Sequence, residues 1–318
     1  MADSCIKIDS ALTDIRLQLI IISLFGIAYP LRINYNYTNK LKFVTKKIEQ
    51  AEAVILMVGY KNVGVIIMST TVKRGFSPND EKEFGGSSVD ILLKAGRDLQ
   101  YLLNQGYHIK GASTFVGNHY LLSERQRLAL VRAVSSEERI RMRKNKEITS
   151  FPPESAVHID GLNTIITLEV ALSDSVLLKC MDGTIRDLAA LRGTYRLIDK
   201  TKTAIMLIGK ILERNKADKV IFYLDAPVSN SGRLKLQIFE LLSAFPFQLE
   251  VEVINNVDAV LEKLDSVITS DAIILDKCAS WFNLNARIIE EINVDYPYID
   301  FGALRMTGES FCLPAKEL

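Results

Sequence analysis

Cysteine and histidine are scarce in this 318-residue sequence, which contains four cysteines and three histidines. The cysteines form no C-x-x-C pair, and the histidines form no H-x-x-x-H group. Structural zinc sites and disulfide-stapled folds depend on such clustered residues. The sequence therefore argues against both, and it predicts a cytoplasmic protein in a reducing environment.

A hydrophobic run long enough to cross a membrane is also lacking. The best candidate, LQLIIISLFGIAYPL at residues 17–31, has 15 residues and contains a glutamine, a glycine and a proline. A spanning helix needs about 20 apolar residues. Three aspartates precede the run, where a signal peptide would carry positive charge. We therefore expect neither a membrane span nor a signal peptide.

Three common nucleotide-binding and hydrolase motifs are absent as well. The sequence has no G-x-x-x-x-G-K-[ST], no G-x-G-x-x-G and no G-x-S-x-G. These absences argue against a P-loop NTPase, a dinucleotide-binding enzyme and an α/β-hydrolase. The composition, 48% apolar and 24% charged, also excludes a collagen-like or largely disordered chain.

Charges of opposite sign gather in the two halves of the chain, although the formal net charge is only +1. Residues 1–150 contain 22 basic and 14 acidic residues, whereas residues 151–318 contain 17 and 24. The halves therefore carry formal charges of +8 and −7. This asymmetry suits a protein whose first half attracts a polyanion while its second half gathers carboxylates.

Residues 1–67 differ from the remainder, because two apolar stretches flank a polar segment and no clear helical or strand period is present. Met68 then begins a segment, MSTTVKRGFSPNDEKEF, that looks like an ordinary N-terminus. We expect translation to start at Met68 and residues 1–67 to be an upstream extension. The alternative is a genuine small hydrophobic N-terminal element.

Residues 68–150 are predicted to form a helical module. Apolar residues recur on one face of VDILLKAGRDLQYLLNQGY, Gly106 is a natural helix end, and SERQ at 123–126 has capping-box spacing. A basic strip follows, consisting of Arg125, Arg127, Arg132, Arg139, Arg141, Arg143, Lys144 and Lys146. It is either a solvated helix face or a phosphate-contacting strip, in which Arg125 and Arg127 are candidate contacts.

A boundary is predicted at FPPES, residues 151–155, because a double proline ends a helix and favours extended backbone. Beyond it, apolar strand patterns alternate with helical patterns. The expected strands are 156–159, 219–224, 248–254 and 266–270, and the expected helices lie near 200–215, 233–245 and 257–264. Residues 151–318 are therefore predicted to form an α/β domain with a mainly parallel sheet covered on both faces.

Three of these strands are followed by an aspartate: Asp160, Asp225 and Asp271. Ligands of open parallel sheets bind beyond the carboxyl ends of the strands. Carboxylates gathered there repel one another unless a cation lies between them, and Mg²⁺ and Mn²⁺ prefer oxygen ligands. The pattern predicts a metal site at this edge, although each aspartate could instead cap the helix that follows it.

Other polar residues near the strand ends could complete such a site. Asn163 could accept a metal-bound water or fix Asp160, and Ser270 could orient Asp271 through its hydroxyl group. Asp258 and Asp276 are reserve carboxylates, which could equally cap a helix or lie on the surface. These four residues are therefore supporting candidates.

The segment MDGTIRDLAALRGTYR at residues 181–196 is a second polar cluster. Arg186, Arg192 and Arg196 could clamp a phosphate, because arginine provides forked donors. Alternatively, Arg186 pairs with neighbouring residues and Tyr195 packs in the core. The sequence leaves both interpretations open.

Two resemblances to known families rest on these residues. RGFSPNDEKEF and GASTFVGNHYLLSERQRLAL resemble the helical module of the family called Domain of Unknown Function 434, over about residues 73–135. HIDGLNTIITLE, VIFYLDAP and VITSDAIILD are similar to the PIN-like and NYN-like nuclease fold, over about residues 155–295.

The second resemblance implies a three-layer α/β domain in which Mg²⁺ or Mn²⁺ activates water to cut RNA. It assigns Asp160, Asn163, Asp225 and Asp271 to the site. Glu169 is the candidate for a further acidic residue on an early helix, and a single Asp271 stands where the family places paired acidic residues. The leading hypothesis is a metal-dependent ribonuclease; the alternatives are a non-catalytic RNA- or nucleotide-binding protein and a partner-binding protein.

Overall fold

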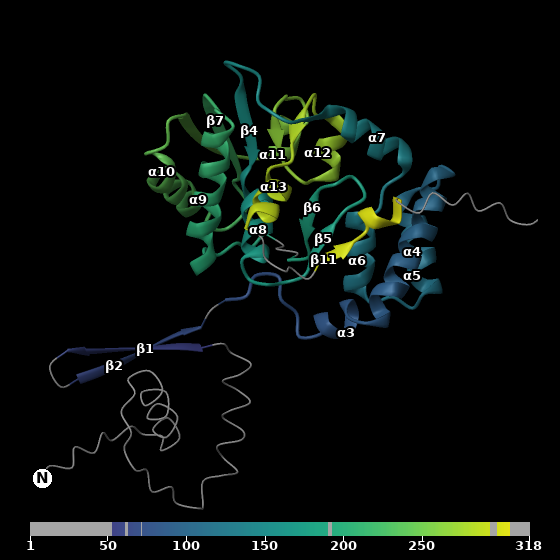
Figure 1. Cartoon of the computed structure of the whole chain (residues 1–318), viewed down its shortest axis with the longest axis horizontal. Helices are drawn as coiled ribbons and strands as arrows, with labels where there is room; N and C mark the ends of the chain where they lie inside the picture. The colour runs from purple at the N-terminus through teal and green to yellow at the C-terminus, as the bar shows by residue number, and fades with distance from the viewer. Residues whose placement is uncertain (1–52, 61–62, 71, 190–192, 293–297, 306–318) are drawn as a thin grey trace, which may run out of the picture. The chain divides into compact units, whose positions relative to one another are not determined.

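The computed structural model describes residues 53–60, 63–70, 72–189, 193–292 and 298–305 (Figure 1). The chain divides into two compact units, residues 1–71 and residues 72–318. None of the helices in these described ranges combines the length and the apolar character needed to cross a membrane. The run at 17–31 lies outside the described residues.

The first unit contains one antiparallel hairpin in its described part. It consists of β1 (Ala53–Tyr60) and β2 (Val63–Thr70), which pair from Ala53 opposite Thr70 to Tyr60 opposite Val63. Near the ends of these strands, Gly59 and Gly64 face each other in the register. Met68 lies inside β2, so the proposed translation start falls within a strand and stays a prediction.

The second unit begins with helices, as the sequence predicts. They are α3 (Asp80–Phe84), α4 (Ser87–Asn104), α5 (Ile109–His119), α6 (Glu124–Ala133) and α7 (Glu137–Lys146). Leu92, Leu99 and Leu130 are fully buried in a shared core. Ser123 and Gln126 form the predicted capping box, which satisfies orphan N–H groups where α6 begins. Periodicity and capping chemistry therefore agree with the observed helices.

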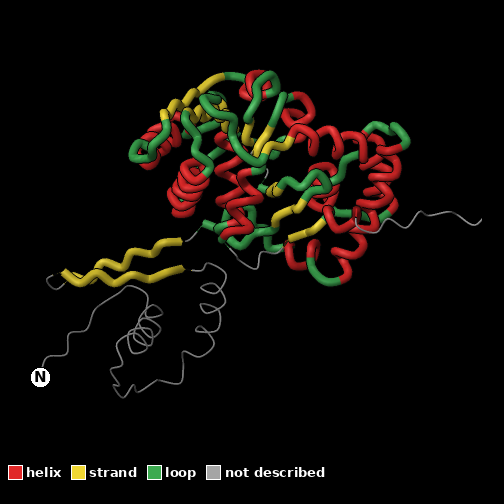
Figure 2. Tube along the Cα trace, turned by 45° about the horizontal axis from the view of Figure 1, so that its top comes forward, coloured by secondary structure: helices red, strands yellow, loops and turns green. Residues whose placement is uncertain are grey.

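A six-stranded sheet follows, in the order β3-β10-β9-β4-β7-β8, and every described pair in it is parallel. Its strands are β3 (Glu147–Ile148), β4 (Ala156–Asp160), β7 (Lys219–Asp225), β8 (Gln248–Ile254), β9 (Val267–Ile268) and β10 (Trp281–Phe282). Figure 2 shows these strands between red helices. The prediction of a mainly parallel α/β architecture is confirmed.

Helices cover both faces of this sheet. They are α8 (Gly161–Ala171), α9 (Asp199–Arg214), α10 (Ser231–Leu242), α11 (Val257–Leu261), α12 (Ala272–Lys277) and α13 (Leu284–Glu291). Along β7, Phe222 joins a core with α8, α9, α10 and α13, whereas Tyr223 joins a separate core with α11 and α12. Successive side chains of a strand point to opposite faces, so this alternation produces three layers.

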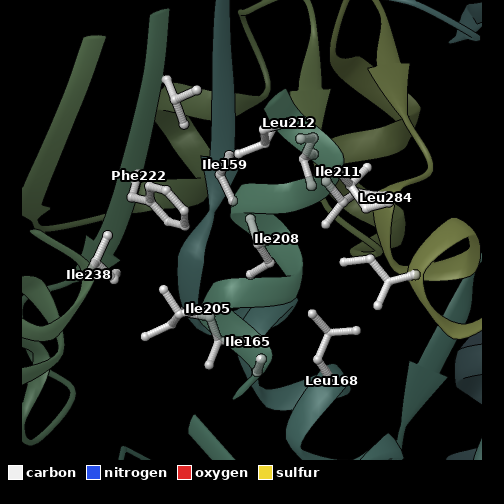
Figure 3. Close-up of a cluster of buried hydrophobic side chains, with 14 of the residues drawn as sticks. Ile159, Ile165, Leu168, Ile205, Ile208, Ile211, Leu212, Phe222, Ile238 and Leu284 are labelled. Carbon is white, nitrogen blue, oxygen red and sulfur yellow. The ribbon is translucent and has the colours of Figure 1, made fainter. Parts of the chain in front are cut away.

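Figure 3 shows the larger core, where Ile159 of β4 and Phe222 of β7 lie against Ile165 of α8 and Ile208 of α9. All four side chains are fully buried. Burying a large aliphatic or aromatic side chain contributes about 1.5–3 kcal/mol. This packing fixes β4 and α8 relative to each other, and the junction between them carries Asp160.

A second, three-stranded sheet was not predicted. It consists of β5 (Leu177–Lys179), β6 (Ile185–Asp187) and β11 (Tyr298–Asp300) in the order β11-β5-β6. Leu178 and Ile299 from this sheet pack into the core of the helices α4 to α6. Residues from both sides of the predicted boundary at 150 therefore share a core, and residues 72–318 form one compact unit.

Candidate functional site

The carboxyl ends of three neighbouring strands carry the predicted aspartates. Asp160 ends β4 and pairs in register with Tyr223, two residues before Asp225 at the end of β7. On the other side, Ile159 pairs with Ile268 of β9, three residues before Asp271. Because all three strands are parallel, these aspartates lie at one edge of the sheet.

The order of connections creates a topological switch point between the neighbouring strands β4 and β9. After β4 the chain forms β7 and β8 on one side, and it then crosses to form β9 and β10 on the other. The strand order therefore reverses between β4 and β9. Ligands of open α/β sheets bind at such a switch point, beyond the carboxyl ends of the strands. Asp160 and Asp271 flank it.

Asp160 is 6% exposed and begins α8. Its carboxylate accepts hydrogen bonds from the Asn163 backbone N–H at 3.4 Å and from Thr269 Oγ1 at 2.9 Å. Its pKa is raised to about 7, first because burial disfavours the charged form; the bond from Thr269 lowers it, and the charges of Asp271 and Asp258 raise it. Burial therefore favours the protonated form of this carboxyl group.

The loop after β9 connects the two sides of the switch point. Thr269 Oγ1 donates to Asp160 and accepts the Asp271 backbone N–H at 3.0 Å. Asp271 caps α12 by accepting the Ile273 backbone N–H at 2.7 Å. Thus Asp160 and Asp271 also have the helix-capping role that the sequence left open as an alternative.

Asn163 and Ser270 form the other link across the switch point. Asn163 Oδ1 accepts both the Ser270 backbone N–H at 2.9 Å and the Ser270 hydroxyl at 2.8 Å. The amide oxygen that could have accepted a metal-bound water therefore holds the β9–α12 loop instead. The predicted pairing of Ser270 with Asp271 is replaced by its contact with Asn163.

Asp258, which the sequence offered only as a reserve carboxylate, interacts electrostatically with the aspartates of the acidic edge. It lies in the first turn of α11, where the residue is exposed overall, and its pKa is raised by partial desolvation of the carboxyl group and by the negative charges of Asp271 and Asp225. The pKa of Asp225 is also raised by burial, while the Val257 backbone N–H donates to its carboxylate and lowers it. The α11 segment therefore brings a fourth carboxylate to the edge.

None of these four carboxylates forms a salt bridge with a lysine or arginine within the described ranges. The charge of Asp271 raises the pKa of both Asp160 and Asp258, and carboxylates gathered in this way favour cation binding. In the same ranges, no group of three or more His, Cys, Asp or Glu side chains is arranged to hold a metal ion. Mg²⁺ commonly takes one or two carboxylates and completes its shell with water and phosphate. The carboxylates of Asp160 and Asp271 are donors of the kind that such an ion takes. A single site that includes Asp160, Asp225 and Asp271 stays a prediction.

A cleft of about 750 Å³ opens next to this edge. Its lining includes Asn163, Ser270 and Asp271 from the α/β part, together with residues of α6, α7 and the α4–α5 turn, including Arg132 and Arg139. Ligand sites commonly have volumes of about 300–1,000 Å³. Basic side chains of the helical module and the strand-end residue Asp271 therefore line the same cleft.

Arg125 and Arg127, the phosphate contacts predicted from the basic strip, have partners inside the protein. The Arg125 guanidinium forms a salt bridge with Asp80 at 2.6 Å and donates to the Leu188 carbonyl at 3.0 Å. Arg127 donates to the carbonyl of Leu122 at 2.9 Å and to Gly117 at 2.7 Å. Both side chains fasten helices and loops together, and neither lines the cleft.

In the segment 181–196, Arg186 and Tyr195 follow the other interpretation that the sequence left open, whereas phosphate binding by Arg192 and Arg196 stays a prediction. Arg186 is 7% exposed and pairs with Asp182 at 2.7 Å, and Tyr195 is fully buried. Arg196 is exposed, whereas Arg192 lies outside the described residues. Arg186 therefore supports the fold, although it reaches the floor of the cleft.

Two further candidates lie away from the acidic edge. Glu169 is fully buried on α8, pairs with Arg74 at 2.9 Å and accepts the Tyr195 hydroxyl at 2.8 Å. It is nine residues from Asp160, which is about 13 Å along a helix. Asp276 pairs with Arg143 at 2.6 Å and with Arg139 at 2.9 Å. Neither residue is placed to join Asp160 in one site.

Gly161 allows α8 to approach the sheet directly after Asp160. A Cβ atom there would lie 2.7 Å from Leu224 Cδ2 and 3.1 Å from the Tyr223 carbonyl oxygen. We expect Gly161→Ala to lower the free energy of unfolding by about 1–3 kcal/mol, because such overpacking forces neighbours apart. Urea denaturation measures the change.

The matched control is Gly111→Ala in α5, where an added Cβ would meet nothing within 4 Å. This substitution should raise the free energy of unfolding by about 0.5–1 kcal/mol, because alanine loses less backbone entropy in a helix. Equal effects at the two positions would contradict the close packing at Gly161.

Comparisons with known proteins find uncharacterised relatives. Residues 91–146 match the family described as "Protein of unknown function (DUF434)", and residues 153–287 match "Domain of unknown function (DUF5616)". The first match confirms the resemblance predicted from the sequence; no family match shows a PIN-like or NYN-like nuclease domain. No solved structure matches the chain.

A relative from Methanocaldococcus jannaschii is described as "Uncharacterized protein MJ0935". It is 36% identical over 184 residues, which cover 57% of this chain and 88% of the relative. Residues 91–146 and 153–287 include both the helices and the acidic sheet edge that border the cleft. The chain therefore belongs to the family of this archaeal protein.

Proposed function

We propose that the protein is a metal-dependent ribonuclease that holds Mg²⁺ or Mn²⁺ at the switch point between β4 and β9. The observation that carries this proposal is the buried Asp160, joined through Thr269 to Asp271 and without a cationic partner in the described part of the chain. A parallel sheet with aspartates at its strand ends also supports the PIN-like and NYN-like resemblance. The proposed substrate, RNA, suits the basic side chains that line the cleft together with Asp271.

Each group of residues has a distinct proposed part. Asp160 and Asp271 hold the ion, and Asp225 and Asp258 add negative charge that favours it. A bound ion would lower the pKa of water and stabilise charge that develops on a phosphate. The Asn163–Ser270 contact fixes the loop that carries Asp271. Arg139, which is exposed beside the cleft, is positioned to attract the phosphate backbone.

The second candidate is a non-catalytic RNA- or nucleotide-binding protein of the same fold. Asp160 and Asp271 both cap helices, a role that requires no metal. The cleft volume also suits a small ligand. Metal dependence separates this candidate from the first.

We expect Asp271→Asn to reduce Mn²⁺-dependent cleavage of a mixed single-stranded RNA pool by about 100- to 1,000-fold, because it removes one charged group from the reacting centre. Asparagine remains a good N-cap residue, so α12 should persist. Gel electrophoresis of labelled RNA, with Mn²⁺ or with EDTA, measures cleavage.

Asp174→Asn is the matched control, because Asp174 is exposed and has a φ of 50°, which asparagine tolerates. Its cleavage rate should equal that of the parent. If the parent shows neither metal-dependent cleavage nor a metal-dependent shift in Tm, the ribonuclease proposal is wrong and the binding protein is the better account.

A further inference from the structure

We infer that Tyr107, in the α4–α5 turn, is a base-stacking residue that receives an unpaired nucleotide of RNA in the cleft beside Asp271. This inference rests on the proposed function for its choice of RNA, and it assigns a specificity role to the helical module. Tyr107 lines the cleft and is 61% exposed. An aromatic ring accessible to a ligand can stack on the face of any base.

The turn holds the Tyr107 backbone in a defined place. Gly106 has a φ of 83°, in the left-handed region that favours glycine. The Gly106 N–H donates to the Leu103 carbonyl at 3.0 Å, and the Tyr107 N–H donates to the Leu102 carbonyl at 3.1 Å. These bonds form a Schellman motif at the end of α4. A fixed backbone reduces the entropy lost when the ring orders on a ligand.

Other exposed apolar side chains line the same cleft. Ile273 is 57% exposed in the first turn of α12, two residues after Asp271, and Val131 on α6 is 45% exposed. Single exposed apolar residues are ordinary, but three that border one cleft form a surface suited to an apolar ligand face. The base of a nucleotide presents such a face.

Charged groups beside this surface suit the phosphate that accompanies a base. The side chain of Arg139 is 61% exposed and pairs with Asp276 at 2.9 Å, and the side chain of Arg132 is 32% exposed and pairs with Asp187 at 3.5 Å. Both arginines line the cleft. Cations next to an aromatic surface are typical of single-strand recognition. A duplex keeps its base faces stacked, so the subsite should discriminate against paired RNA.

The test measures binding without cleavage. Fluorescence anisotropy follows a short, labelled, single-stranded RNA in EDTA, with the full-length protein. Tyr107→Ala should raise the Kd about 5- to 100-fold, which is the effect of losing one base–aromatic stack. Tyr107→Phe keeps the ring and should remain within about twofold of the parent. A 2-aminopurine in the RNA should be quenched by the parent and by Tyr107→Phe, and less by Tyr107→Ala.

Tyr101→Ala is the matched control, since Tyr101 is 64% exposed on α4 and does not line the cleft. Its Kd should equal that of the parent. A parent that fails to bind single-stranded RNA in EDTA, a Tyr107→Ala variant that binds normally, or equal binding of duplex RNA would overturn the inference. Binding that depends on Tyr107 without any metal-dependent cleavage would uphold the subsite while rejecting the ribonuclease proposal.

Discussion

Asp160→Asn is expected to raise the free energy of unfolding by about 2 kcal/mol near pH 8 in EDTA, while it abolishes stabilisation by Mn²⁺. The reason is the burial of Asp160 among other carboxylates, which raises its pKa to about 7 from 3.8. Above this pH the folded protein must hold a buried negative charge. Asparagine removes that charge and keeps nearly the same volume.

The direction of the pH dependence follows from the raised pKa. Between about pH 4 and pH 7 the folded protein keeps the Asp160 proton, whereas the unfolded chain has released it. The contribution of Asp160 to stability is therefore full below about pH 4 and is lost as pH rises to about 7. The full difference approaches about 4 kcal/mol, and the lost acceptor in asparagine offsets part of it.

Urea denaturation at several pH values, in EDTA, measures this effect. Desolvation also raises the pKa of Asp225 and of the partly desolvated Asp258, and it lowers that of His158. Several groups therefore contribute to the pH dependence of the parent's free energy of unfolding. The difference between the parent and Asp160→Asn isolates one of them. Equal pH slopes in the two proteins would contradict the raised pKa of Asp160.

Arg143→Ala is expected to lower the free energy of unfolding by about 3–5 kcal/mol. Arg143 is 1% exposed and pairs with Asp182 at 2.7 Å and with Asp276 at 2.6 Å. It also donates to the Ser135 hydroxyl at 3.0 Å. Truncation leaves buried acceptors without this cation, and it removes the buried one of the two arginines that link α7 to Asp276 of α12.

Arg139→Ala provides the comparison within the same cluster. Arg139 pairs with the same Asp276 at 2.9 Å, but its side chain is 61% exposed. Exposed pairs contribute about 0–1 kcal/mol, so its loss should change stability by no more than that. Arg143→Lys keeps the positive charge but loses the forked donors of the guanidinium group. Its loss in free energy of unfolding should lie between those of Arg143→Ala and Arg139→Ala. If urea denaturation shows similarly small effects for all three substitutions, Arg143 does not join α7 to α12.

The long elements of this fold could be predicted from the sequence because their patterns are long enough to have a period. The strand cores KVIFYL and QLEVEVI became β7 and β8, and the apolar face after residue 200 became α9. The strands β3, β5, β6, β10 and β11 have two or three residues each. Such short segments show no alternation, and only their tertiary pairing defines them.

The acidic edge could also be predicted, because parallel strands place their carboxyl ends at the same edge of the sheet. The roles of the arginines could not. Arg125 reaches Asp80, 45 residues away, and backbone carbonyl groups of distant loops, which no sequence pattern reveals. Glu169 looked available for a site, yet it pairs with Arg74 across 95 residues. Tyr107 had one local signal, its position directly after the helix-ending Gly106.

The most direct test of the metal site is a crystal structure of the protein soaked in Mn²⁺, with anomalous diffraction data. The account predicts a Mn²⁺ peak between β4 and β9, with oxygen atoms of both Asp160 and Asp271 within about 2.0–2.6 Å and water completing the shell. Crystals of Asp160→Asn, soaked in the same way, should lack this peak. Absence of the peak in the parent, or a peak bound only by residues away from the acidic edge, would contradict the account.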